Sequence, residues 1–123
     1  MASLFERVGG LEGTDKLVVN FYNRVLADPE LSSFFEHVAM DKLHTMQREF
    51  FSAALDGPLS YTGKPIYQAH FGRGIERKHF AKFVDHLFGT LQTFDLNERE
   101  VSEVIGRINT YVDEVVGGHG LAG

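Results

Sequence analysis

The sequence predicts an all-α fold made of several short helices and two long C-terminal ones. Apolar residues recur at steps of three and four through most of the 123-residue chain, and no segment alternates apolar and polar residues as a strand does. Ser, Asp and Asn stand where helices would begin, and glycine pairs or Asp-Pro stand where they would end. At this length we expect residues 1–123 to form a single domain.

The N-terminal part predicts two helices separated by a glycine pair. Ser3 and Glu6 have the spacing of a capping box, and Gly9-Gly10 should end this first helix after one or two turns. A second helix is expected to begin at residues 14–15 and to end before Asp28-Pro29, because the residue before a proline avoids helical geometry. Its apolar stripe comprises Leu17, Val18, Phe21, Tyr22, Val25 and Leu26. Tyr22 places a hydroxyl in that stripe, and a buried hydroxyl needs a hydrogen-bond partner.

A short helical turn and a longer helix follow. Asp28 can cap the turn with Pro29 at its first position, and the turn carries the Phe34-Phe35 pair. Asp41 should then cap a helix over residues 42–55. The apolar positions of this helix are Leu43, Met46, Phe50, Phe51 and Ala54.

Gln47 is the most informative residue of that helix. It lies four residues from both Leu43 and Phe51, and therefore on the apolar face. An amide there needs an interior partner, which is a neighbouring carbonyl on the structural interpretation and a bound ligand on the functional one. The opposite face, predicted to be solvated, comprises Lys42, Thr45, Arg48, Glu49 and Ser52.

An irregular connection over residues 56–64 leads to a short helical stretch around His70. Pro65 suits the first turn of a helix, and Gly72 would help to end it. Ile66 lies four residues before His70 on the same helical face, so the imidazole is predicted to face the interior. His70 is then either a core histidine hydrogen-bonded to a carbonyl or an iron ligand.

Two long helices complete the chain. The first is predicted from Arg77 to Thr93, and the second follows the capping box Asn97-x-x-Glu100 and ends at Gly117-Gly118. Their core faces comprise Phe80, Phe83, Val84, Leu87, Phe88 and Leu91, and Val101, Val104, Ile105, Ile108, Val112 and Val115.

The composition excludes several classes of site and partner. No cysteine is present, which rules out disulfides, iron–sulfur sites and haem attached through Cys-x-x-Cys-His. The net charge of −5 includes no basic run, so we expect no nucleic-acid partner. No segment approaches the ~20 apolar residues of a membrane span, and the N-terminus lacks a signal-peptide core. We therefore expect a cytoplasmic protein without membrane association and, since no apolar stripe is left over, a monomer.

The histidines restrict the possible metal chemistry. No two of the six are three or four residues apart, so no helix offers two imidazoles to one metal ion. Glu76-x-x-His79 is half of a di-iron motif without its second copy, so His79 is interpreted as a surface or helix-start residue. His44 and His86 are expected on polar faces beside Asp41 and Asp85.

One inward imidazole, one inward phenol and one inward amide remain. His70 can offer a neutral imidazole to iron, and the 11 Phe residues can supply apolar walls for a porphyrin. Tyr22 and Gln47 can donate hydrogen bonds to a diatomic ligand without ionising. This set of groups is typical of a haem pocket.

A set of short motifs spans nearly the full chain. They are Phe21-Tyr22-x-Arg24-Val25-Leu26-Ala27-Asp28, Phe34-Phe35, Leu43-x-x-x-Gln47, Glu49-Phe50-Phe51, Tyr61-Thr62-Gly63, His70 with Gly72-Arg73-Gly74-Ile75, and His79-Phe80. In these motifs the chain resembles the group I truncated haemoglobins. The resemblance implies a two-over-two helical sandwich around non-covalent haem b. The chain departs from the family at Asp56-Gly57, where a glycine pair is usual.

The same resemblance implies roles for individual residues. His70 would be the proximal iron ligand, with Phe35 packed on the macrocycle, and Tyr22 and Gln47 would donate to the distal ligand. Met46 stands where some relatives have an iron-ligating histidine, so an open distal site is expected. Leu43 would lie beside the ligand and Phe51 along an apolar gas tunnel. Further haem contacts are expected from Met46, Phe50, Tyr61, Ile66, Ile75, Phe80 and Phe83, and propionate partners among Lys42, Tyr61, Thr62, Lys64 and Arg73.

The implied function is reversible dioxygen binding at a five-coordinate ferrous iron, with nitric oxide and carbon monoxide as further ligands. Nitric oxide dioxygenation, a detoxification that yields nitrate and leaves ferric iron, would need an unidentified reductase. Oxygen storage and this turnover need the same donors, so the sequence is compatible with both. The alternatives are a six-coordinate haem sensor or electron-transfer protein, and a helical interaction module without haem in which His70, Tyr22 and Gln47 satisfy one another.

Overall fold

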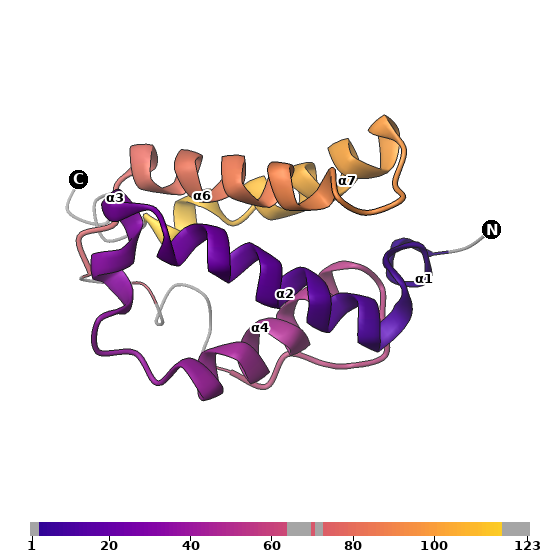
Figure 1. The fold of residues 1–123 in the computed structure, drawn as a ribbon, viewed down its shortest axis with the longest axis horizontal. Coiled ribbons are helices and arrows are strands. Elements are labelled where there is room, and N and C mark those ends of the chain that lie inside the picture. Colours follow the sequence, from indigo (N-terminus) through magenta and orange to yellow (C-terminus); the bar gives the residue numbers. More distant parts are fainter. Residues whose placement is uncertain (1–2, 64–69, 71–72, 117–123) are drawn as a thin grey trace.

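The computed structural model describes residues 3–63, 70 and 73–116, and the regular structure within them is helical throughout, which confirms the predicted all-α class (Figure 1). The elements are α1 (Leu4–Val8), α2 (Gly10–Leu26), α3 (Pro29–Ser32), the 3-10 helix η1 (Ser33–Phe35), α4 (Met40–Ala54), α6 (Arg77–Leu91), α7 (Glu98–Asn109) and α8 (Val112–Val115).

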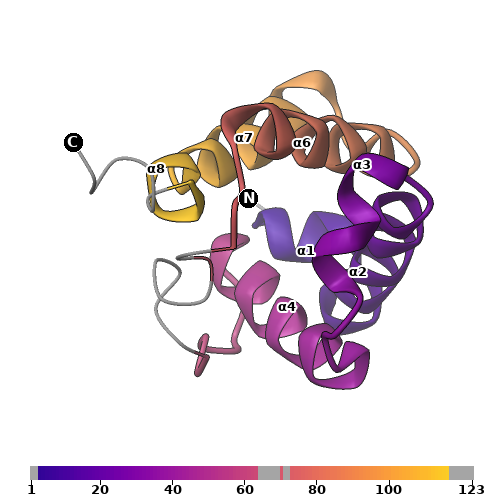
Figure 2. The ribbon, with the colours of Figure 1, turned by 90° about the vertical axis from the view of Figure 1, so that its left-hand side faces the viewer.

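The long helices form two layers. In Figure 1, α6 and α7 run side by side above α2 and α4, and Figure 2 shows the same arrangement end-on, with α3 closing one side. Helix α2 packs against both α4 and α6, while α7 packs against α6 and α4. Two helices thus lie over two, as the sequence predicted.

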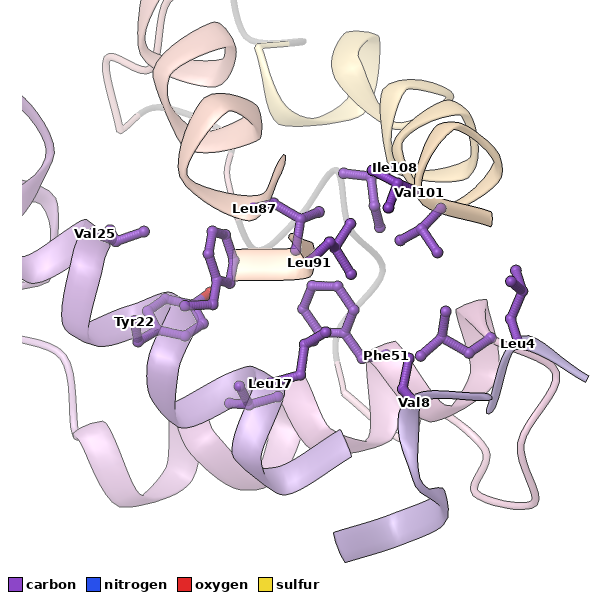
Figure 3. Packing of buried hydrophobic residues seen from close by; sticks show 14 of the residues in the cluster. Leu4, Val8, Leu17, Tyr22, Val25, Phe51, Leu87, Leu91, Val101 and Ile108 are labelled. Carbon is purple, nitrogen blue, oxygen red and sulfur yellow. The ribbon is translucent and has the colours of Figure 1, made fainter. Parts of the chain in front are cut away.

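Apolar side chains from both layers meet in one core. Figure 3 shows side chains of α2, α4, α6 and α7 converging, with Leu87 and Leu91 near the ring of Phe51. The largest side chains that are almost wholly buried are Phe21, Phe51, Leu17, Leu55, Leu87 and Leu91. Each such burial contributes about 1.5–3 kcal/mol, so this cluster fixes how the two layers face each other.

The start of α2 differs from the prediction. The helix begins at Gly10 rather than at residues 14–15, because Gly9 adopts a left-handed conformation, with φ 108°, that ends α1 and turns the chain directly into α2. Thr14 does not cap the helix but donates its hydroxyl to the Gly10 carbonyl within it, at 2.8 Å. Gly13 lies so close to α1 that a Cβ there would overlap the carbonyl oxygen of Val8.

Helix α4 also departs from the prediction in its cap and its polar face. It begins at Met40 after Ala39, so Asp41 lies in the first turn instead of capping it, and the helix ends at Ala54 rather than Leu55. Ser52, predicted to be solvated, is fully buried, and its hydroxyl accepts the backbone N–H of Leu59 at 3.1 Å. The chain after α4 folds back over this face, which the helical period alone could not indicate.

The C-terminal helices differ from the prediction at the end of α6 and within the last predicted helix. Helix α6 stops at Leu91, and the predicted last helix is divided into α7 and α8 around Thr110 and Tyr111. The Thr110 hydroxyl donates to the Arg107 carbonyl at 2.6 Å, which competes with the helical hydrogen bonds at the break. The predicted end at Gly117-Gly118 lies outside the described residues. The capping boxes at Ser3 and Asn97 and the cap at Asp28 are confirmed.

Candidate functional site

A cavity of about 350 Å³ lies between the two layers, and its wall is mostly apolar. This volume is in the range of sites that hold small molecules or cofactors. Every predicted site residue that the structure describes lines this cavity; Ile66 lies outside the described residues. The predicted residues on the wall are Tyr22, Phe35, Leu43, Met46, Gln47, Phe50, Tyr61, His70, Ile75, Phe80 and Phe83.

The wall also contains residues that the sequence did not assign to the site. Helices α3 and η1 and the loop after them contribute Leu31, Phe34 and Val38, while α7 and α8 contribute Ile108 and Val115. Ile108 and Val115 belonged to a predicted apolar stripe, so the signal for them existed. Tyr111 lies three residues after Ile108 and four before Val115, so the same helical period groups it with them. Its ring meets that of Phe50 at 5.2 Å between centroids.

Tyr22 brings an uncharged donor to this wall. It lies on α2 and is only 7% exposed, with its ring edge-on to Phe35 and Phe83. Burial raises the pKa of its hydroxyl, because the anion would lose its hydration, so the group stays protonated at neutral pH. Among the described residues, no group forms a hydrogen bond with this hydroxyl.

Gln47 brings a second donor from α4. Its side chain is half-buried on the face of α4 that lines the cavity, and it too forms no hydrogen bond within the described part of the chain. Two polar side chains therefore reach a mostly apolar cavity without a hydrogen-bond partner among the described residues. Both groups are free to donate to a molecule bound in the cavity.

Met46, next to Gln47, has an apolar environment. Its methyl group occupies the space that a Cβ on Gly63 would need, beside the ring of Tyr61. Met46 thus packs against the loop that follows α4.

The two histidines of the wall differ in their hydrogen bonds. His70 has helical backbone geometry, and its carbonyl accepts the backbone N–H of Arg73 at 3.3 Å. His79 lies in the first turn of α6, where its Nδ1 accepts the backbone N–H of Glu76 at 2.9 Å. The interpretation of His79 as a helix-start residue is therefore confirmed, and its place on the cavity wall is new.

The other half-buried histidines have partners that the sequence did not indicate. His44 is 3.6 Å from Asp15 on α2, and His86 is 2.7 Å from Asp28. Within the described ranges, no three His, Asp or Glu side chains gather where they could hold a metal ion. A metal in the cavity would therefore have to bring most of its own ligands.

Polar residues at the loop after α4 are partly engaged already. Thr62 donates its hydroxyl to Glu49 at 2.7 Å and its backbone N–H to the same oxygen at 2.9 Å, which lowers the pKa of Glu49. Burial, with a smaller effect of the Glu49 charge, raises the pKa of Tyr61. Of the suggested propionate partners, Tyr61 and Arg73 line the cavity. Lys64 lies outside the described residues.

Comparisons with known proteins agree with this geometry. The family described as "Bacterial-like globin" matches residues 3–116. The group 1 truncated hemoglobin GlbN of Mycolicibacterium paratuberculosis is 44% identical over 117 residues, which is 95% of this chain and 86% of that protein. The chain belongs to the group 1 truncated haemoglobins. As a truncated haemoglobin it is a haem-binding globin, a family that binds gaseous ligands such as dioxygen.

Solved structures of truncated haemoglobins have the same fold. The Fe(III) form from Tetrahymena pyriformis superposes with a TM-score of 0.87 at 28% identity, covering 93% of this chain and 97% of that one. The 2/2 hemoglobin from Synechococcus, solved in the cyanomet state with covalently attached heme, also has a TM-score of 0.87, at 29% identity, covering 94% of this chain and 99% of that one.

The residues of this truncated haemoglobin fit a haem group. The macrocycle needs apolar walls, which the Phe-rich cavity provides, and the iron needs one imidazole, which His70 can supply. The unpartnered donors of Tyr22 and Gln47 suit a ligand with partial negative charge.

In the described part of the chain, no helix is both long and apolar enough to cross a membrane.

Proposed function

We propose that this truncated haemoglobin holds haem b non-covalently through His70 and binds dioxygen reversibly at a five-coordinate ferrous iron. The observation that carries the proposal is the pair of uncharged donors, Tyr22 and Gln47, that reach the same apolar cavity as His70 without partners in the described protein. When bound, haem supplies a ferrous iron with an open coordination position for a diatomic gas.

Tyr22 and Gln47 would determine the dissociation rate of such a gas. Each can donate one hydrogen bond to a ligand that draws negative charge from iron, and neither ionises at neutral pH. A hydrogen bond to a charged partner contributes about 1.5–3 kcal/mol, which corresponds to one to two decades in affinity. The surrounding phenylalanines exclude water, which strengthens these hydrogen bonds.

The Tetrahymena pyriformis structures support these two positions. The solved variants of that protein include one with a tyrosine changed to phenylalanine and one with a glutamine changed to glutamate, and these two positions are as far apart in its chain as Tyr22 and Gln47 are here. The non-covalent attachment is proposed because the chain lacks cysteine, although the Synechococcus protein carries covalently attached heme.

Nitric oxide dioxygenation is the enzymatic candidate. It joins nitric oxide and dioxygen to nitrate with one electron, which an external reductase would supply. A second cavity of about 420 Å³ between α2 and α4 shares Tyr22 and Leu43 with the first. This arrangement leaves room for a second small molecule beside Tyr22, which is compatible with a reaction between two gases.

Absorption spectra of the purified protein test the proposal. The ferrous protein should show a five-coordinate spectrum, convert to a stable oxygenated spectrum in air, and bind carbon monoxide. Rapid mixing of the oxygenated form with nitric oxide should then yield stoichiometric nitrate. A low-spin ferrous spectrum without added ligand would favour the six-coordinate sensor or electron-transfer protein. Failure to take up haem would overturn the proposal.

A further inference from the structure

A buried carboxylate lies where α2, α3 and α6 meet. Asp28 is 7% exposed, and its Oδ1 accepts the backbone N–H of Glu30 at 2.9 Å, which caps α3. Its Oδ2 is 2.7 Å from Nε2 of His86 and 3.1 Å from Nζ of Lys82, both on α6. One carboxylate thus ties the start of α3 to the middle of α6.

The capping role does not explain why this residue carries a charge. Asparagine caps a helix about as well as aspartate, and a buried carboxylate loses hydration that a neutral amide would lose only in part. The short contact with His86 offsets that loss when the imidazole is protonated, since charged hydrogen bonds are about twice as strong as neutral ones. The charge of Asp28 therefore strengthens the contact between α3 and α6.

Both sides of this contact continue into the cavity wall. From α3 and η1 come Leu31 and the Phe34-Phe35 pair, and from α6 come His79 and Phe80. The ring of Phe34 meets that of His79 at 4.9 Å between centroids. A shift of α3 away from α6 would therefore open the wall that encloses the cofactor.

Other charged groups lie around this pair. Lys82 also contacts Glu30, at 3.2 Å, and Arg24 of α2 places its guanidinium against Gly89, near the last turn of α6. Asp85 precedes His86 in the chain and is exposed. The His86 side chain is 26% exposed.

We propose that Asp28 and His86 are positioning residues that hold the α3–η1 wall against α6 and thereby increase the retention of haem. The effect on haem rests on the proposed function, whereas the hold on α3 does not depend on it.

The first test is the rate at which the haem-loaded protein loses haem to an excess of a high-affinity globin acceptor at neutral pH. Asp28→Asn keeps the cap and removes the charge, so haem loss should become about tenfold faster, the size of effect of one charged hydrogen bond. His86→Gln keeps a hydrogen-bond donor toward Asp28, so its haem loss should stay closer to the wild-type rate than that of His86→Ala.

Asp113→Asn is the matched control. Asp113, on α8, pairs with Arg77 of α6 at 2.8 Å but is largely exposed, and it does not line the cavity. This variant should lose haem at the wild-type rate.

Amide hydrogen exchange of the chain as purified gives a second measurement that does not require haem. Exchange at residues 29–35 should be faster in Asp28→Asn than in Asp113→Asn, while exchange in α7 stays the same. Unchanged exchange there, together with unchanged haem loss, would overturn the positioning role. A wild-type chain that takes up no haem would instead overturn the proposed function, and the exchange measurement would still decide the role of the pair.

Discussion

The ring of Tyr22 meets that of Phe35 edge-on, with centroids 5.7 Å apart and an angle of 80° between the planes. The hydroxyl of Tyr22 therefore stands on a wall of aromatic carbon, where it lacks a protein partner within the described residues. Such a hydroxyl destabilises the haem-free protein, and it becomes useful when a ligand accepts a hydrogen bond from it. This contrast makes the role of Tyr22 testable.

Tyr22→Phe should have opposite effects on folding and on ligand binding. Removing an unpaired buried hydroxyl should raise the free energy of unfolding of the haem-free chain, or leave it unchanged, with a gain of up to about 1–2 kcal/mol. In the haem-loaded protein the same change should speed dioxygen dissociation by about 10–100-fold. Urea unfolding and stopped-flow displacement of dioxygen by carbon monoxide measure the two effects. Reduced stability with an unchanged off-rate would mean that Tyr22 is only a packing residue.

The pH dependence of stability should also show that the hydroxyl of Tyr22 is buried in the folded state. Burial raises the pKa of its hydroxyl in the folded state above the ordinary value of about 10, so the folded chain holds this proton more tightly than the unfolded chain does. The stabilisation is complete below the unfolded pKa and is lost as pH rises above it. Thermal melts of wild type should therefore fall steeply above about pH 10, and Tyr22→Phe should fall less.

His70→Ala should weaken haem retention. A missing direct ligand should cost more than the roughly 10–100-fold typical of changes to the groups that only support a ligand. His37, which is exposed and does not line the cavity, provides the same substitution as a control. Haem transfer rates should rise in His70→Ala and stay unchanged in His37→Ala, and added imidazole should partly restore retention in the first. A five-coordinate histidine-ligated ferrous spectrum in His70→Ala would contradict the assignment.

Asp28 should make stability fall in acid. The hydrogen bond from His86, followed by that from the Glu30 backbone, lowers the pKa of Asp28 from 3.8 to about 2. The stabilisation is therefore present above about pH 4 and is lost as pH falls toward 2. The wild-type free energy of unfolding should decline over that range, and the decline should be smaller in Asp28→Asn. Equal slopes in the two proteins would show that Asp28 is not engaged in the folded state.

The features that sequence predicted well depend on neighbours in the chain. The caps at Ser3, Asp28 and Asn97 are satisfied within three residues, so local spacing was enough to find them. The apolar face of α4 placed Gln47 on the cavity wall for the same reason. The prediction that His70 ligates iron rests on the resemblance to a family, because the short helical stretch predicted around it has little period of its own.

The features that sequence missed depend on contacts between distant segments. Ser52 is buried because the chain near Leu59 folds back over α4, and no helical pattern contains that information. His86 pairs with Asp28, 58 residues away, rather than with the adjacent Asp85. In each case tertiary packing outweighed the local preference.

The junction of α1 and α2 gives a prediction about stability alone. A Cβ on Gly13 would overlap the backbone carbonyl of Val8, and backbone cannot rotate away as a side chain can. Gly13→Ala should therefore separate α1 from α2 and lower the free energy of unfolding by about 3 kcal/mol, the upper end for overpacking. Gly106→Ala is the matched control, because nothing lies within 4 Å of a Cβ there. This second variant should be more stable by up to about 1 kcal/mol through helix propensity. Urea unfolding of both proteins gives the comparison, and a Gly13→Ala variant as stable as wild type would show that α1 does not pack against α2 in solution.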